Sequence, residues 1–289
     1  MTSEGAEQTF GGPWSVLKTE MVAKYLTFFT TALSRQPFEL VYIDAFAGSG
    51  AFRYVPESSQ VELLPDTKRV HEGSASLALS TQPPFHRVVF VEQRRKNVLA
   101  LEKLIARSGH RNASIEQGDA NDVLRAYCDP ADWTTRRGVI FLDPFGMNVE
   151  WPTLEMIAAT KALDVWFLFS LGGVNRNIPD SITRLDDTKR RAVTKVLGTE
   201  AWIEEFYQLP ATPSIDPTAL PSTEHKVVGM DDLERYMLHR LKTVFPFVAE
   251  PKRLRGHQSV FSLFFAVSNP APSAIRLAQG PAQHILKAR

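Results

Sequence analysis

The feature that most limits the fold of this chain is a regular alternation of short apolar runs with segments of helical periodicity. The apolar runs are nearly continuous, which is typical of strands buried on both faces of a parallel sheet. They fall at residues 38–43, 87–91, 114–116, 138–142 and 164–170. The pattern predicts an α/β fold with a doubly wound, mostly parallel, Rossmann-like sheet covered by helices on both faces.

Composition excludes several other classes of protein. A chain of 289 residues with 44% hydrophobic residues and a net charge of +1 is typical of a globular protein rather than a disordered one. The single cysteine, Cys128, rules out an internal disulfide framework and fits a reducing compartment, so we expect a cytoplasmic location. The longest apolar run, near 165–171, is far too short to cross a membrane, and no membrane partner is expected.

Four of the predicted strands are followed by an acidic residue: Asp44, Glu92, Asp119 and Asp143. Ligands of open parallel sheets bind outside the carboxyl ends of the strands, where the strand order reverses. The sequence therefore predicts four carboxylates around one crevice. Asp119 has a second interpretation, because an acid after a strand can simply cap the next helix.

The residues after Asp44 and Glu92 indicate a nucleoside cofactor. Gly48 and Gly50 follow Asp44 in a tight turn, and a backbone without Cβ can approach a ligand closely. An acid at the end of the second strand can accept hydrogen bonds from both hydroxyls of a ribose. This arrangement suits NAD and S-adenosylmethionine equally, so at this stage both cofactors remain open.

The last two acids favour methyl transfer over hydride transfer. Asp119 could accept a hydrogen bond from an adenine amino group, and Asp143 with Pro144 and Phe145 could hold an acceptor amine beside an aromatic ring. A carboxylate that takes the hydrogens of an amine frees its lone pair, and Phe145 could stack on a planar base. A nicotinamide-dependent oxidoreductase has no use for these residues and is the weaker hypothesis.

Two blocks of sequence carry a resemblance to a known family. Residues 42–50, Tyr-Ile-Asp-Ala-Phe-Ala-Gly-Ser-Gly, and 141–146, Phe-Leu-Asp-Pro-Phe-Gly, resemble class I S-adenosylmethionine-dependent methyltransferases and, more closely, the three-Cys-motif partner proteins. Shorter matches are Lys18 with Tyr25, Gly73-Ser74 and residues 197–199 before Trp202. The similarity spans roughly residues 14–267.

The resemblance implies an S-adenosylmethionine cofactor and a link to a separate protein with three cysteines, an iron–sulfur protein. It also implies that Phe46, within the first block, belongs to the cofactor site. The tetrapeptide at 143–146 is similar to that of tRNA guanine-N2 methyltransferases. It departs from the Asp-Pro-Pro-Tyr of DNA amino-methyltransferases, because the aromatic residue stands third.

Four parts of the chain are expected. They are an N-terminal helix docking on the core (1–36), a methyltransferase-like core (37–174), a helical insertion (175–230), and a last helix, β-hairpin and C-terminal tail (231–289). Within them we predict a long loop at 51–72, a helix at 231–245 with Asp231 as its N-cap, and strands at 247–250 and 259–267.

The leading hypothesis is an S-adenosylmethionine-dependent methyltransferase acting on an amino group of a nucleobase or nucleic acid. The alternative is a non-catalytic, methyltransferase-like partner of the three-cysteine protein. The predicted catalytic residues are Asp143, Pro144 and Phe145, and the predicted cofactor-binding residues are Asp44, Phe46, Gly48, Gly50, Glu92 and Asp119. Lys18 and Tyr25 are interpreted as packing and surface residues of the first helix, which docks on the core, rather than as ligands. The seven histidines lack paired ligand spacing, so no metal site is predicted.

Overall fold

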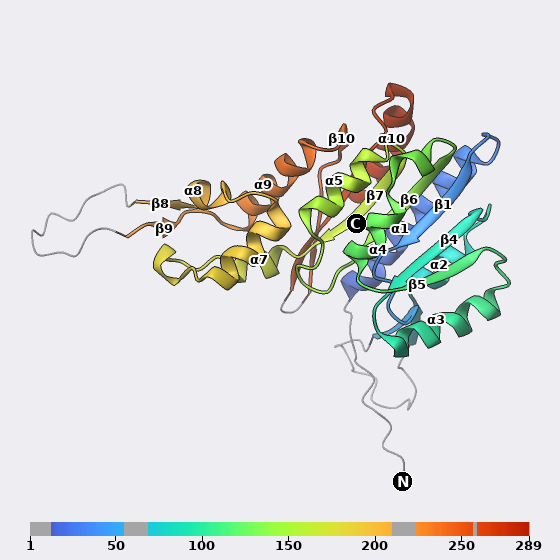
Figure 1. Cartoon of the computed structure of the whole chain (residues 1–289), viewed down its shortest axis with the longest axis horizontal. Coiled ribbons are helices and arrows are strands. Elements are labelled where there is room, and N and C mark those ends of the chain that lie inside the picture. The colour runs from blue at the N-terminus through green and yellow to red at the C-terminus, as the bar shows by residue number, and fades with distance from the viewer. Residues whose placement is uncertain (1–12, 55–68, 210–222, 257–258, 289) are drawn as a thin grey trace, which may run out of the picture.

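The computed structural model describes residues 13–54, 69–209, 223–256 and 259–288. Its centre is an eight-stranded sheet (Figure 1). Five strands of this sheet are parallel and lie in the order β7-β6-β1-β4-β5. They are β1 (Glu39–Asp44), β4 (Arg87–Glu92), β5 (Ala113–Gln117), β6 (Arg136–Leu142) and β7 (Leu163–Phe169).

The chain reverses direction across the sheet at β1. It runs from β1 outward through β4 to β5, then returns to the other side of β1 and continues through β6 to β7. The strands are almost wholly buried, as their continuous apolar runs require: every residue of β7 is buried. The prediction of a doubly wound, mostly parallel α/β fold is confirmed, and β1 lies at its switch point.

Antiparallel strands complete the sheet beyond β7. Strand β12 (Val260–Val267) pairs antiparallel with β7, and both β10 (Phe247–Val248) and β11 (Lys252–Arg255) pair with β12. The predicted hairpin is present, but it is formed by β11 and β12, and β11 was not predicted. Pro251 has no N–H to donate and separates β10 from β11, so the predicted single strand at 247–250 is shorter than expected.

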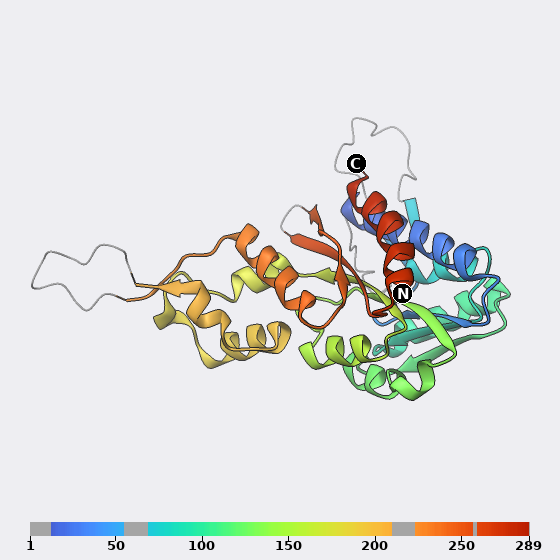
Figure 2. The ribbon, with the colours of Figure 1, turned by 90° about the horizontal axis from the view of Figure 1, so that it is seen from above.

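Helices cover both faces of the sheet (Figure 2). One face carries α1 (Pro13–Leu33), α2 (Ser74–Ser80), α3 (Arg95–Ser108) and α10 (Pro272–Lys287). The other carries α4 (Ala120–Tyr127), α5 (Trp151–Ala159), α6 (Leu171–Arg176) and α9 (Met230–Lys242), with the short 3-10 helix η1 (Pro130–Trp133). Each face has its own hydrophobic core.

Between α6 and α9 the chain builds a lobe that projects from the sheet (Figure 1). It contains the 3-10 helix η2 (Ile182–Arg184), α7 (Asp187–Leu197), α8 (Trp202–Phe206) and a ribbon of β8 (Tyr207–Gln208) with β9 (His225–Lys226). Val193, Trp202 and Phe206 bury their side chains in the same core as α5 and α9. Lys226 Nζ donates to Asn175 Oδ1 at 2.6 Å and ties the ribbon to α6.

Three local expectations were wrong. The ends of the predicted 51–72 loop form a ribbon of β2 (Ala51–Tyr54) and β3 (Arg69–Glu72), strands too short to give a clear pattern, and residues 55–68 lie outside the described residues. Helix α9 is capped by Gly229, whose N–H donates to Asp232 Oδ2 at 2.8 Å, while Asp231 lies in the first turn. The expected C-terminal tail forms α10, because burial of Ala282 and Leu286 outweighs the poor helix propensity of Gly280 and Pro281.

None of the helices in the described part of the chain combines the length and the apolarity that a membrane span needs.

A buried carboxyl lies beneath helix α1, at the amino end of β7. Tyr25 donates its hydroxyl to Asp164 Oδ2 at 2.6 Å, and the Tyr25 ring packs edge-on against Trp166. Burial raises the pKa of Asp164 to about 7, although the hydrogen bond from Tyr25 acts in the opposite direction. Between about pH 4 and pH 7 the folded protein therefore binds a proton here that the unfolded chain releases.

Asp164→Asn should remove this pH dependence, because an amide keeps the acceptor for Tyr25 and cannot ionise. The free energy of unfolding of the variant, relative to wild type, should rise by up to about 4 kcal/mol between roughly pH 4 and pH 8. Urea denaturation across that range measures it. Asp132→Asn, at an exposed position, is the matched control. A constant difference between the Asp164 variant and wild type would contradict the buried-carboxyl interpretation.

Candidate functional site

The four predicted acids lie along one edge of the sheet. Asp44 is the last residue of β1 and Glu92 the last of β4, whereas Asp143 directly follows β6 and Asp119 follows β5 by two residues. Because these strands are parallel neighbours in the order β6-β1-β4-β5, their carboxyl ends are adjacent. The edge therefore carries, in spatial order, Asp143, Asp44, Glu92 and Asp119.

Asp44 is completely buried at this edge. Its Oδ2 accepts a hydrogen bond from Ser74 Oγ at 2.5 Å, and its Oδ1 accepts one from Phe46 N at 3.3 Å. Burial and, to a lesser extent, the charge of Asp143 together raise the pKa of Asp44 to about 7, while the hydrogen bond from Ser74 and the charge of Lys18 act to lower it. Asp44 therefore changes charge close to neutral pH.

The turn after Asp44 depends on two glycines with positive φ. Gly48 has φ of 60° and Gly50 has φ of 77°, conformations that residues with a Cβ rarely adopt. A Cβ on Gly50 would lie 2.6 Å from Leu104 Cδ2, so Gly50 also allows close packing on α3. A Cβ on Gly48 would meet no atom of the described residues within 4 Å, so these residues leave the backbone there open to approach. Phe46 is half-buried and packs on the core of the opposite face.

Glu92 and Asp119 differ in how much of each carboxylate is already bonded. Glu92 is 8% exposed; its Oε1 accepts from Arg94 N at 2.6 Å, and its Oε2 accepts no hydrogen bond from any described residue. Asp119 is exposed and caps α4, accepting at Oδ1 from Asn121 N at 2.9 Å. Capping of α4 therefore uses only Oδ1 of Asp119. Its Oδ2 accepts no hydrogen bond from the described residues.

The segment after β6 presents an acid and an aromatic ring. Asp143 is half-buried, Pro144 is buried, and the Phe145 side chain is 56% exposed. Gly146 has φ of 69° and turns the chain back toward α5. Arg94, which follows β4, holds its guanidinium carbon 5.7 Å from the centre of the Phe145 ring. A cation and an aromatic face therefore stand together at the edge that carries the acids.

Lys18 belongs to this site, although the sequence analysis assigned it to packing. Its ammonium donates a hydrogen bond to Asp143 Oδ2, and the residue is only 6% exposed. The same ammonium lies 5.2 Å from the centre of the Trp14 ring and 5.7 Å from that of Phe141. A signal for this was available, because Lys18 falls on the same helical stripe as Trp14 and Val22 and is thus a charge on a buried face.

A second residue that the sequence analysis missed is Asn121, in the first turn of α4. Its side chain is buried and makes four hydrogen bonds. Oδ1 accepts from Glu150 N at 3.0 Å and from Thr153 Oγ1 at 2.8 Å, while Nδ2 donates to Asn148 O at 3.0 Å and to Asp119 Oδ1 at 3.1 Å. Asn121 thereby fixes the far end of the segment that begins at Asp143.

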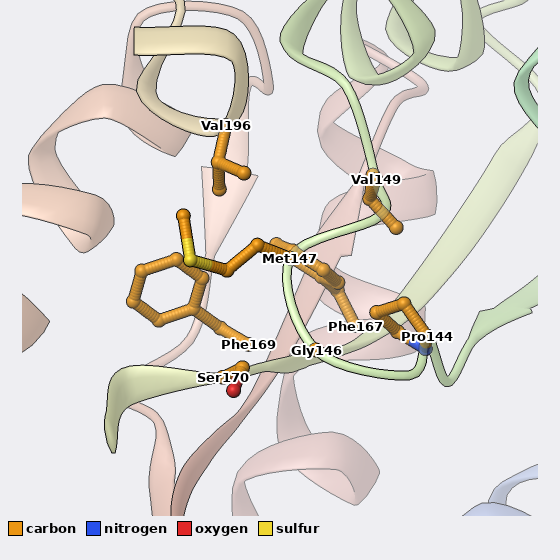
Figure 3. A pocket seen from close by; sticks show the side chains of 8 residues that line it. All are labelled: Pro144, Gly146, Met147, Val149, Phe167, Phe169, Ser170 and Val196. Atoms are coloured by element: carbon orange, nitrogen blue, oxygen red, sulfur yellow. The ribbon is translucent and has the colours of Figure 1, made fainter. Parts of the chain in front are cut away.

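A small apolar hollow with a volume of about 10 Å³ lies beside this segment. It is lined by Pro144, Gly146, Met147, Val149, Phe167, Phe169, Ser170 and Val196. In Figure 3, Met147 and Phe169 lie below Val196, which comes from α7 of the projecting lobe. The lobe thus contributes a wall next to the Asp143 segment. Within the described residues no cluster of three or more metal-ligating side chains occurs.

Comparisons with known proteins find similarity in structure only. No family model matches the chain, and no curated protein is similar to it in sequence. Among solved structures, protein LPL1258 from Legionella pneumophila is 14% identical with a TM-score of 0.48, covering 92% of this chain and 90% of that one. Trm1 from Pyrococcus horikoshii, solved with S-adenosyl-L-methionine, is 12% identical with a TM-score of 0.48, covering 96% and 61%.

Human methyltransferase-like protein 13, solved in complex with SAH, is 12% identical with a TM-score of 0.43, covering 94% of this chain and 92% of that one. All three TM-scores are below 0.5. A proposal about the function of this chain must therefore rest on its own residues and their geometry.

Asn121→Ala should destabilise the protein and loosen the segment after Asp143. The substitution removes Oδ1, the atom that accepts hydrogen bonds from Glu150 N and from the buried Thr153 Oγ1. We expect a loss of about 2 to 3 kcal/mol in the free energy of unfolding, measured by urea denaturation. Asp122→Ala, one residue along and exposed with its ion pair to Arg125, should change stability by less than about 0.5 kcal/mol. Equal effects would show that Asn121 is not a structural tie.

Proposed function

We propose that this chain is an S-adenosylmethionine-dependent methyltransferase that acts on an amino group of a nucleobase or nucleic acid. The observation that carries the proposal is the edge of the sheet at the switch point. There a buried Asp44 and a nearly buried Glu92 flank an open glycine turn, next to Asp143 with an exposed aromatic ring.

The residues present fit this cofactor. It carries an ammonium group, a sulfonium and a ribose diol, and carboxylates are the natural acceptors for the first and the last. Asp44 and the turn at Gly48 and Gly50 would hold the methionine part, and Glu92 would use Oε2 for the ribose. The open approach at Gly48 supports this assignment. Asp119 would offer Oδ2 to the adenine amino group while Oδ1 continues to cap α4.

The bound cofactor would supply an electrophilic methyl group at the same edge. Asp143 would accept an N–H of the acceptor amine and so keep the nitrogen lone pair directed at the methyl carbon. Once the nitrogen is methylated, Asp143 or water would accept the proton that the amine loses. Most of the rate would come from holding the two reacting atoms in line, about 3 to 3.5 Å apart.

The surroundings of Asp143 support a planar acceptor. Phe145 is one of few large apolar side chains that are exposed in the described structure, and a base could stack on its ring. Arg94 stands beside that ring and could contact a phosphate next to the base. An amino group on a nucleobase therefore suits the site better than an amine on an aliphatic chain.

A second candidate is a non-catalytic, methyltransferase-like subunit that binds a separate iron–sulfur protein with three cysteines. Two exposed apolar side chains favour it: Leu209 is 60% exposed and Val227 is 51% exposed. They adjoin β8 and β9, in the lobe that projects from the sheet (Figure 1). The two lie at opposite ends of the ribbon, because Val227 N donates to Phe206 O whereas Leu209 follows Gln208, so each would contribute separately to a protein-binding surface. Co-purification with such a protein, with no methyl transfer, would support this candidate.

Binding of the cofactor is the first test. S-adenosylmethionine or its demethylated product, at about a hundredfold excess over its dissociation constant, should stabilise the fold by about 2.7 kcal/mol. Thermal unfolding with and without ligand measures this, and NADH is the control. Transfer of labelled methyl to separate pools of RNA, DNA and protein then identifies the acceptor. No thermal shift with either sulfur nucleoside would refute the proposed cofactor.

Two isosteric substitutions should separate the cofactor end from the acceptor end. Glu92→Gln keeps the hydrogen bond from Arg94 N but removes a charged acceptor, so the cofactor dissociation constant should rise about tenfold or more. Asp143→Asn should leave that constant within about twofold and lower kcat, since its contact matters mainly in the reacting state. Isothermal titration and methyl-transfer kinetics measure the two quantities. The reverse pattern would exchange the two assignments.

A further inference from the structure

Lys18 is a buried charge that neither the fold nor the proposed chemistry by itself requires. It comes from α1, 125 residues before its partner Asp143. The helix is held at this point by Trp14, one turn earlier, which stacks on Phe261 of β12 with ring centres 4.6 Å apart. A Cβ on Gly256 would lie 2.7 Å from Trp14 Nε1, so the hairpin fits closely around the indole. Lys18 therefore reaches Asp143 from a fixed support.

The charges around Lys18 explain what it can do. Two carboxylates lie at the ends of neighbouring strands: Asp44 of β1 pairs in register with Phe141 of β6, two residues before Asp143. Among the described residues, the other titratable group that interacts with both carboxylates is Tyr42 of β1, which is buried. Its hydroxyl stays protonated, because burial and then the charges of Asp44 and Asp143 raise its pKa. Ser74 of α2 donates to Asp44. Among the described residues, Lys18 is thus the cation that acts on Asp44 and bonds Asp143.

We propose that Lys18 is a positioning residue of the methyl-transfer site. By holding Asp143 Oδ2 it leaves Oδ1 for the acceptor amine, and its charge offsets the repulsion between Asp143 and Asp44. This inference rests on the proposed function and assigns to α1 a part in it.

The physical reason is repulsion between like charges away from water. Two neighbouring carboxylates repel each other, and a cation beside them offsets that repulsion, so that Asp143 can keep its place next to Asp44. Beyond the effect of burial, Asp143 raises the pKa of Asp44 and Lys18 lowers it, so the two partners of the ion pair act on Asp44 in opposite directions. Asp143 Oδ1 accepts no hydrogen bond from the described residues, which leaves it available to a substrate.

The first test uses the free protein and needs neither cofactor nor acceptor. Carbon-13 NMR of the Asp44 carboxyl gives the pH at which it loses its proton. Lys18→Met should move this midpoint upward, and Asp143→Asn should move it downward. Lys24→Met, at an exposed position of the same helix, is the matched control and should leave it unchanged. A Lys18→Met midpoint equal to that of the control would overturn the proposal.

Removing one partner of a buried ion pair can prevent folding. The double variant Lys18→Met with Asp143→Asn leaves no unpaired charge from this pair, so it can be titrated by NMR even if Lys18→Met alone does not fold. Because the two removed charges act on Asp44 in opposite directions, its midpoint should return toward that of wild type. A midpoint for the double variant above that of Lys18→Met would overturn the proposal.

The second test uses methyl transfer to whichever pool accepts the label from wild type. Lys18→Met should lower kcat about 100-fold, the loss expected when a reacting group is displaced by about 1 Å. KM should change little, and Lys18→Arg should restore part of kcat. If Lys18 acts through Asp143, Lys18→Met should cost little more once Asp143→Asn is present. Additive losses, or a methyl group found on Lys18 itself, would overturn the proposal.

The two tests separate failure of the proposed function from failure of this inference. A wild-type protein that binds no S-adenosylmethionine and transfers no methyl group refutes the proposed function, whereas the NMR titration still decides whether Lys18 controls the charge of Asp44.

Discussion

The pairing of β1 with β6 on one side and β4 on the other is the constraint on which the site depends. This parallel register aligns Asp44 with Phe141 and Phe90. It therefore brings the acids that end three different strands to one edge. A shift of β1 by one residue would turn Asp44 to the opposite face, away from Lys18 and Ser74. The apolar cores on both faces fix this register, because every side chain of β1 after Glu39 is buried.

Polar groups at this edge are held by the tertiary structure rather than by the strands that carry them. Asp44 is fully buried and gains Ser74 from α2, while Asp143 gains Lys18 from α1. Asn121 of α4 ties down the end of the segment that starts at Asp143. Burying carboxylates is unfavourable unless such partners are present. The edge is thus a place where the fold gives up stability, as sites that bind charged ligands commonly do.

In the projecting lobe and the C-terminal helix, local sequence patterns do not predict the structure well. Helix α10 contains Gly280 and Pro281, and β2 and β3 have four residues each. Their structure depends on what they pack against, and intrinsic preference is a weak guide there. The lobe was predicted as helical, but its contribution of Val196 to the hollow beside Asp143 depends on how α7 docks.

The sequence by itself determined the doubly wound sheet, the acids at the carboxyl ends of its strands and the glycine turn after Asp44. Those features follow from local patterns: continuous apolar runs make buried parallel strands, and positive φ favours glycine. Only the tertiary structure decided which carboxylates are buried, that Asp119 caps α4, and that Lys18 reaches Asp143. Contacts between residues so distant in the chain are set by the docking of helices on the sheet. The helical stripe indicates that Lys18 is a buried charge, but no local pattern identifies Asp143 as its partner.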